Sequence, residues 1–336
     1  MGLPSDLVDF FSLQKTSQRK KGPDGKSPSR LTPSTIGDFF DETDHDHSLA
    51  WEAASVCRRL IDAGVLTAAG NGKGSPPYSE CYYALGAPPQ HTNPPVYEFL
   101  AYGFPEIHKY YQAAVRPIIL EKPNGDPDIG TGFMLANRMF VTARHCIYNM
   151  RNAIIKGWNP AESPLKSIHA FANEGMDVAM LEFETDPFPG TAGFKIAQSR
   201  ILDDVMSMGF PQIQGFDNTL VAEKSQISAI LKSSTGLVVS ECESYLDSQH
   251  YLLLSARVKG GNSGGPVIGK RGAVIGVVTH LPADDFGRPD LLGYAAALPM
   301  KYIHSLVKLA ENPNDEYSTI DFEATETGFK THEIST

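Results

Sequence analysis

Short apolar segments separated by turn residues dominate the chain beyond residue 110. Runs of β-branched and aliphatic residues occur at 115–119, 140–142, 237–239, 251–254 and 273–278. Runs of this length between glycine and proline turns are typical of strands in an all-β domain. Toward the end of this region, Tyr302, Ile303, Leu306 and Val307 repeat at helical spacing, so a helix is predicted over residues 300–309.

The first 110 residues have a different pattern, in which helices precede two short strands. Ser48 is a candidate cap for a helix that runs through Ala63 and has an apolar face made by Leu49, Ala53, Val56 and Leu60. A shorter helix is predicted over residues 34–40, and strands over 65–67 and 81–85. Helix, strand, glycine loop and strand outline a winged helix, a fold that serves DNA binding and protein contacts alike.

These patterns divide the chain into five predicted segments. Residues 1–33 are expected to be a flexible N-terminal segment, since much of it is rich in Lys, Arg, Ser, Pro and Gly. Residues 34–86 form a small winged-helix-like module, and 87–111 a proline-rich connector. Residues 112–311 form the large β domain, and 312–336 an acidic, mobile tail.

Composition and charge disfavour several classes of function. The chain has 336 residues, of which 41% are apolar, enough for one large core and a smaller one. No apolar run is long enough to span a membrane, and no signal-peptide pattern is present, so a cytoplasmic protein with no membrane partner is predicted. The formal net charge is −10, which makes nucleic acid an unlikely partner. In the predicted helix, Arg58 and Arg59 are balanced by Glu52 and Asp62, so residues 34–86 are predicted to bind a regulatory protein.

Neither cysteine spacing nor the acidic residues predict a metal site. Cys57, Cys81, Cys146 and Cys242 are scattered without the spacing of a disulfide framework or a zinc motif, so free thiols are predicted. Residues 41–47 alternate carboxylates with histidines, and such side chains can bind zinc. A polar loop whose carboxylates favour the N-terminus of the next helix is the simpler interpretation. No metal or cofactor is therefore predicted.

Three short motifs carry the candidate chemistry. Residues 261–266 are Gly-Asn-Ser-Gly-Gly-Pro, a turn suited to presenting Ser263 beside backbone N–H groups. Residues 142–146 are Thr-Ala-Arg-His-Cys around His145, and residues 177–181 are Asp-Val-Ala-Met-Leu, which begin with Asp177. The order His, Asp, Ser is one of the known orders of a catalytic triad.

The three motifs resemble those of the trypsin/chymotrypsin-like serine proteases, and the resemblance covers roughly residues 112–310. Within that family the chain is most similar to the compact bacterial HtrA-like branch, where asparagine also precedes the serine, but without a C-terminal peptide-binding module. The resemblance implies a mainly β fold of two six-stranded antiparallel β-barrels, with the triad in the cleft between them. It also implies an oxyanion hole made by the N–H groups of Gly261 and Ser263, and a supporting role for Thr279 beside the aspartate.

The residue types fit this chemistry. A serine hydroxyl needs an adjacent base, and His145 has a suitable pKa to take its proton and return it to the leaving amine. Asp177 would hold the imidazole in the required tautomer. The substrate would be a protein or peptide. Asn262 stands where trypsins that mature by cleavage have an aspartate, so no zymogen-type activation is predicted, and any activation would act by loop movement.

The sequence leaves substrate preference open. Arg257, six residues before the nucleophile, corresponds to the floor of the primary specificity pocket in the family, where a guanidinium would favour Asp or Glu before the cleaved bond. His280 adds some support, as some relatives bind glutamate with a pocket histidine. Alternatively, Arg257 points to solvent. Ala295 and Ala296 as pocket walls would instead favour a small apolar side chain.

Three functions remain in competition on sequence grounds. The first is a serine endopeptidase that is regulated by a partner protein through residues 34–86. The second is a protease fold that acts by binding without cleavage, against which the complete set of triad residues argues. The third is a DNA-binding regulator whose winged helix makes the main contact.

Overall fold

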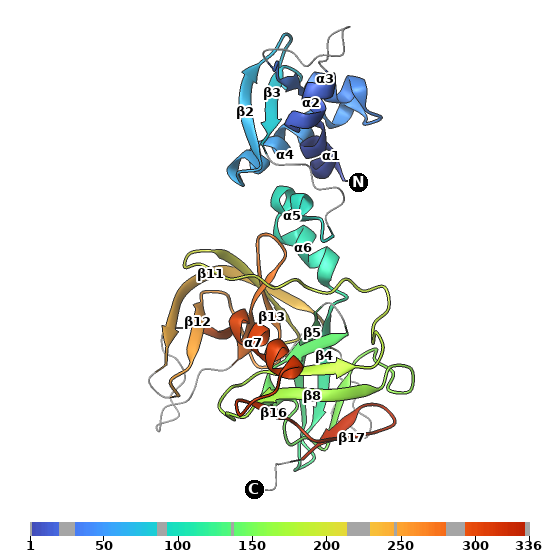
Figure 1. The fold of residues 1–336 in the computed structure, drawn as a ribbon, viewed down its shortest axis with the longest axis vertical. Helices are drawn as coiled ribbons and strands as arrows, with labels where there is room; N and C mark the ends of the chain where they lie inside the picture. Colours follow the sequence, from blue (N-terminus) through green and yellow to red (C-terminus); the bar gives the residue numbers. More distant parts are fainter. Residues whose placement is uncertain are drawn as a thin grey trace. The chain divides into compact units, whose positions relative to one another are not determined.

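The computed structural model describes residues 2–19, 31–85, 93–135, 138–213, 229–244, 247–279 and 293–332. The chain divides into two compact units, residues 1–107 and residues 108–336 (Figure 1). Helix α6 (Phe104–Tyr111) begins in the first unit and ends in the second. Each unit has its own hydrophobic core and is described separately.

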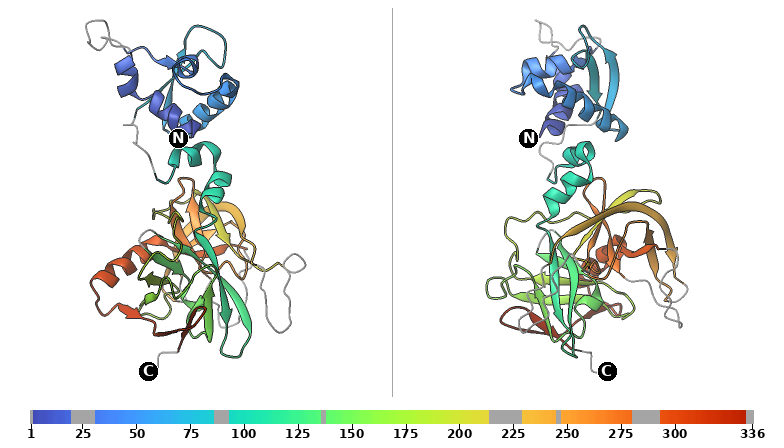
Figure 2. Two further views of the ribbon diagram at one scale, coloured as in Figure 1. Left: turned by 90° about the vertical axis from the view of Figure 1, so that its right-hand side faces the viewer. Right: turned by 180° about the vertical axis from the view of Figure 1, so that it is seen from behind.

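The N-terminal unit places helices against one face of a three-stranded sheet (Figure 2). Its elements are α1 (Leu3–Phe10), α2 (Leu13–Arg19), β1 (Ser34–Thr35), α3 (Ile36–Glu42), η1 (His47–Leu49), α4 (Ala50–Asp62), β2 (Leu66–Asn71), β3 (Glu80–Ala84) and α5 (Val96–Tyr102). The strand order is β1-β3-β2, all antiparallel. The core includes Leu7, Phe11, Phe39 and Leu60, all fully buried.

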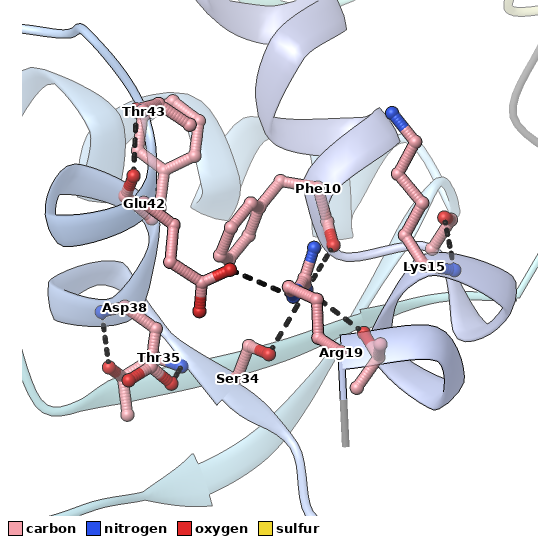
Figure 3. A network of polar contacts seen from close by, with 11 residues as sticks. Phe10, Lys15, Arg19, Ser34, Thr35, Asp38, Glu42 and Thr43 are labelled. Carbon is pink, nitrogen blue, oxygen red and sulfur yellow. Dashed lines mark hydrogen bonds and ion pairs between the residues drawn. The ribbon is translucent and has the colours of Figure 1, made fainter. Parts of the chain in front are cut away.

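Arg19 ties three segments of this unit together (Figure 3). Its guanidinium donates to the Phe10 carbonyl at 2.7 Å and to Ser34 Oγ at 3.2 Å, and it lies 3.8 Å above the Phe10 ring. It also forms an ion pair with Glu42 at 3.3 Å. Arg19 thus links α1 to β1 and to the end of α3, although the sequence analysis expected it in a flexible segment.

The N-terminal boundaries differ from the prediction. Residues 3–19 were expected within a flexible segment, but α1 and α2 are helices, and Leu7 and Phe11 belong to the core. Part of the predicted connector is helix α5, which packs on α1 and α4. The expected basic linker over residues 20–30 lies outside the described residues. The helix predicted from Ser48 begins instead with η1, where Asp46 Oδ1 accepts from the Ser48 amide at 2.8 Å.

The strands of the second unit include most of those that the apolar runs predicted. They are β4 (Val115–Glu121), β5 (Pro127–Met134), β6 (Met139–Thr142), β7 (Asn152–Ile155), β8 (Leu165–Phe171), β9 (Ala179–Phe183), β10 (Asp204–Gly209), β11 (Lys232–Glu243), β12 (His250–Leu254), β13 (Pro266–Gly269), β14 (Val274–Thr279), β15 (Ala295–Pro299), β16 (Tyr317–Thr319), β17 (Phe322–Ala324) and β18 (Phe329–Thr331). Helix α7 (Met300–Glu311) occupies the predicted position of the closing helix.

One of the two expected barrels closes and the other does not. Strands β10-β11-β12-β15-β14-β13 form a closed six-stranded barrel, as predicted. The other strands form a curled nine-stranded sheet in the order β16-β8-β9-β6-β5-β4-β7-β18-β17. The expected second six-stranded barrel is therefore an open half-barrel, because β7 and β8 pair with strands from the C-terminal segment and not with each other.

The C-terminal segment was expected to be a mobile tail, and the structure corrects this. Residues 317–331 contain strands β16, β17 and β18, which form both edges of the nine-stranded sheet. Ile320 and Phe329 are buried, and an apolar side chain gains free energy when it leaves water. The acidic residues of this segment, such as Glu323 and Glu326, stay exposed.

Candidate active site

His145 lies in a short 3₁₀ helix that follows strand β6. This helix, η2 (Arg144–Cys146), begins where β6 ends at Thr142. The neighbouring Arg144 is buried, and its guanidinium donates to the Phe171 carbonyl at 3.1 Å, which holds η2 against strand β8. The histidine is thereby held at the end of a rigid strand, which limits the positions that its imidazole can adopt.

Asp177 contacts His145 through both of its carboxylate oxygens. The His145 backbone N–H donates to Oδ1 at 2.9 Å, and His145 Nδ1 lies 2.7 Å from Oδ2. An ionised carboxylate only accepts hydrogen bonds, so Nδ1 carries the proton in this contact. In the neutral imidazole, Nε2 is therefore the nitrogen that can accept a proton.

Thr279 brings the closed barrel into the same cluster. It is the last residue of β14, and its hydroxyl donates to Asp177 Oδ2. Asp177 lies between β8 and β9 of the nine-stranded sheet, so this hydrogen bond joins the two sheets of the second unit. Thr279 was a prediction of the resemblance alone, and the structure places it in contact with Asp177.

The pKa values of the pair are displaced in opposite directions. Burial would lower the pKa of His145, but the hydrogen bond to Asp177, the contact with Cys146 Sγ and the charge of Asp177 raise it above the ordinary histidine value. Burial would raise the pKa of Asp177, but hydrogen bonds from His145 and Thr279 hold it below its ordinary value. The carboxylate is therefore ionised and stabilises an imidazolium.

Ser263 lies in a turn before β13 whose backbone is held from three sides. The Thr131 amide donates to the Ser263 carbonyl at 2.9 Å, and the Gly264 amide donates to the Val278 carbonyl at 2.7 Å. Gly264 has φ +82°, which suits glycine, and an added Cβ would collide with the Thr131 carbonyl oxygen. The side chain of Ser263 is half-buried.

Cys146 connects Ser263 to the His145 pair. Its Sγ lies 3.6 Å from His145 Nε2 and 3.5 Å from the Ser263 carbonyl oxygen. The imidazole and the nucleophile turn therefore belong to one site. No hydrogen bond from Ser263 Oγ to His145 Nε2 is formed among the residues that the structure describes, and such bonds often form only when substrate binds.

The chain before Ser263 forms a tight turn that a backbone hydrogen bond closes. The Asn262 amide donates to the Lys259 carbonyl at 3.0 Å, and Gly261 at the third position has φ +94°. Positive φ at this position defines a type II turn and requires glycine. Within the described ranges, the N–H groups of Gly261 and Ser263 donate to no backbone carbonyl.

Thr131 is a structural residue of the site that the sequence analysis did not single out. Its hydroxyl donates to the Gly261 carbonyl at 2.6 Å and accepts from the Phe210 amide at 3.1 Å, and its side chain is fully buried. Thr131 thus holds both Gly261 and Ser263. The only sequence signal was its position between Gly130 and Gly132 before the histidine strand.

The residues predicted for the specificity pocket do not all lie together in the structure. Ala296 pairs in register with Thr279, and Ala295 precedes it at the start of β15, so both lie on the strand next to Thr279. The side chain of Arg257 is exposed, and its amide donates to Ser234 Oγ at 2.9 Å. His280 lies outside the described residues.

The other candidate chemistry of the sequence does not form a site. His45 stacks on Phe39 and forms an ion pair with Asp6 at 3.1 Å, and no group of His, Cys, Asp and Glu in the described ranges is placed to hold a metal ion. The four cysteines are free thiols. Among the described helices, none has the length and apolar composition needed to cross a membrane.

Residues 130–277 match a family model that is described as a trypsin-like peptidase domain. A search of the curated proteins found no match. Among solved structures, a variant of the HtrA-type protease AlgW with a tripeptide matches with a TM-score of 0.46 and 14% identity, over 66% of this chain and 69% of that one.

Two further solved structures are similar. The Rv3671c protease from M. tuberculosis in its active form has a TM-score of 0.46 and 19% identity, over 62% of this chain and 84% of that one. The serine endoprotease from Yersinia pestis has a TM-score of 0.42 and 16% identity, over 62% of this chain and 67% of that one.

The geometry predicts how His145 titrates. NMR of the imidazole should give a pKa above 6.5 in the wild type, and Asp177→Asn should lower it, because the anionic acceptor is lost while the side-chain shape is kept. His145→Gln identifies the resonance. Equal pKa values in the wild type and in Asp177→Asn would show that the carboxylate does not control the imidazole.

Proposed function

We propose that the protein is a serine endopeptidase in which Ser263 is the nucleophile, His145 the general base and Asp177 the group that orients the histidine. The observation that carries the proposal is the Asp177 carboxylate. It accepts from Nδ1 of His145 and leaves Nε2 facing Cys146 Sγ, which also contacts the backbone of Ser263.

The reaction follows from these positions. Nε2 of His145 takes the proton of the Ser263 hydroxyl as its oxygen attacks the peptide carbonyl carbon. The negative oxygen of the tetrahedral intermediate accepts hydrogen bonds from the N–H groups of Gly261 and Ser263. His145 then protonates the leaving amine as the C–N bond breaks. In the second half, His145 takes a proton from water as the water attacks the ester carbon, and it returns the proton to Ser263 Oγ when the bond from the acyl carbon to that oxygen breaks. Asp177 stabilises the imidazolium that exists between the two proton transfers.

We also propose that the enzyme becomes active without cleavage of its own chain. Asn262 cannot form the ion pair with a new N-terminal amine, since its side chain is an uncharged amide. The type II turn at 259–262 supports the idea, because it already directs the Gly261 amide away from internal partners. Control would then act through loop positions and not through processing.

For specificity we propose an acidic side chain on the substrate before the cleaved bond, bound by Arg257. In the described part of the chain Arg257 has no ion pair, and its guanidinium is free to reach a carboxylate. The alternative is a small apolar side chain beside Ala295 and Ala296, both of which are buried.

We further propose that the N-terminal unit binds a regulatory protein in the cytoplasm. Its strand order β1-β3-β2 and the succession α3, α4, β2, β3 agree with a winged helix. The exposed face of α4 carries Trp51, which is 65% exposed, and large aromatic residues are frequent anchors of protein interfaces. Arg58 donates a hydrogen bond to Glu80, and Arg59 donates one to the Ala101 carbonyl, so neither guanidinium is free to bind a DNA phosphate.

The first test of the proposed function is Ser263→Ala. Hydrolysis of a peptide library should fall by about a million-fold in kcat, since the nucleophile is lost. A fluorophosphonate should label the wild type and not Ser263→Ala. Ser75→Ala, which alters an exposed serine of the other unit, serves as the control. Equal hydrolysis or equal labelling by Ser263→Ala would disprove the proposed nucleophile.

The specificity proposal predicts the effect of Arg257→Ala. Cleavage after Asp and Glu should fall by about tenfold or more in kcat/KM, while cleavage after small apolar residues should stay within about twofold. Arg257→Lys should keep part of the preference because it keeps the charge. Unchanged cleavage profiles in Arg257→Ala would exclude a role for this residue in the pocket.

The partner proposal predicts weak DNA binding by the full chain. Electrophoresis with duplex DNA should show no retardation at micromolar protein and physiological salt. A retarded complex that weakens steeply as salt rises would instead indicate contacts with phosphates and would favour the DNA-binding alternative.

A further inference from the structure

The C-terminal strands complete the sheet that carries His145 and Asp177. We call residues 315–332 the C-terminal strap. Strand β16 pairs with β8 from Tyr317 opposite Phe171 to Thr319 opposite His169, and β18 pairs with β7 at Phe329 opposite Ala153. Figure 1 shows β16 lying along β8. Without the strap, β7 and β8 would be the two edges of the sheet, with unpaired backbone groups.

Packing fixes the strap firmly in this position. Phe329 is fully buried, and its ring lies 6.1 Å from that of Trp158. Ile320 is buried as well, and its amide donates to the Ile168 carbonyl at 2.9 Å. At Gly328 an added Cβ would collide with the Ala153 carbonyl oxygen, so the strap approaches β7 as closely as only glycine permits.

Thr331 attaches the strap to the loop that follows His145. Its hydroxyl donates to the Ile147 carbonyl and accepts from the Met150 amide at 3.0 Å, while its own amide donates to the Met150 carbonyl at 3.0 Å. The side chain is 2% exposed. One residue thus holds both ends of the segment 147–150, which connects η2 to β7.

The other end of the strap is anchored at a distance from this loop. Tyr317 hydroxyl lies 2.7 Å from His169 Nδ1, on β8. His169 in turn lies 3.2 Å from Glu182 Oε2. Tyr317 and Thr331 thus hold the strap at separate places, and within the described residues of the strap Thr331 makes the polar contacts with the segment adjacent to His145.

We propose that Thr331 is a positioning residue that holds the imidazole of His145 in place through the segment 147–150. The proposal rests on the proposed role of His145 as the base. η2 contains only three residues, and its orientation depends on the segments on both sides: strand β6 before it and the loop held by Thr331 after it. A displacement of about 1 Å in a catalytic group can reduce the rate of catalysis by a hundredfold. Loosening of the segment 147–150 would therefore slow the reaction, although this segment need not touch the substrate.

The test compares Thr331→Val, which keeps the shape and removes the hydroxyl, with Thr331→Ser, which keeps the hydroxyl. Thr319→Val is the matched control, since Thr319 lies in the same strap and is exposed. Tyr317→Phe loosens the other anchor. Each full-length variant is assayed for kcat, KM, fluorophosphonate labelling rate and circular dichroism.

Thr331→Val should lower kcat and the labelling rate about tenfold with KM within about twofold, since two buried hydrogen bonds are lost. Thr331→Ser, Thr319→Val and Tyr317→Phe should stay within about threefold of the wild type. A folded Thr331→Val with unchanged kcat would overturn the proposal, as would an equal loss in Thr319→Val. If Thr331→Val does not fold, Thr331→Ala takes its place, and failure of both to fold would show a role in stability alone.

NMR of His145 separates this proposal from the proposed function. The pKa of His145 should move in Thr331→Val and not in Thr319→Val, and this measurement does not require hydrolysis. If the wild type shows no hydrolysis that depends on Ser263, the proposed function fails. An unchanged pKa of His145 in Thr331→Val would independently disprove the positioning role of Thr331.

Discussion

The site depends on one carboxylate. Asp177 accepts hydrogen bonds from the backbone and the ring of His145 and from the hydroxyl of Thr279, so it satisfies a buried charge with donors from both sheets of the second unit. A buried carboxylate that lost these donors would be costly, and the two sheets are therefore held in the one arrangement that supplies them all. The same contacts fix the tautomer of His145. Geometry of the site and packing of the two sheets are thus maintained by the same interactions.

Local sequence was sufficient for the features that depend on local chemistry. The segment around His145, the glycines of the nucleophile turn and the short apolar runs each impose their structure on a few neighbouring residues, and the closed barrel and α7 agree with the prediction. The positive φ of Gly261 and Gly264 follows from the same reasoning, because these turns admit no side chain. The contact between Thr279 and Asp177 agrees with the expectation taken from the family resemblance.

Features that depend on distant partners could not be read from the sequence. The strap is polar and acidic, and its apolar residues Ile320 and Phe329 are too far apart to show a strand period, so only the edges of β7 and β8 reveal what they pack against. Helix α1 gave no clear signal for the same reason, since its apolar side chains find their partners in α4 and α5. Thr131 resembles any strand threonine until the fold places it beneath Gly261 and Ser263. Among the residues predicted for the specificity pocket, Arg257 is exposed and His280 lies outside the described residues.

The order of synthesis gives the strap a further consequence. Strands β16, β17 and β18 leave the ribosome after the six other strands of the sheet they complete, so a nascent chain whose His145, Asp177 and Ser263 have all emerged still has two open edges. Domains fold as units once their parts are available. The edge at β7 therefore stays unpaired until residues 329–331 have been synthesised, and the sheet reaches its full width only then.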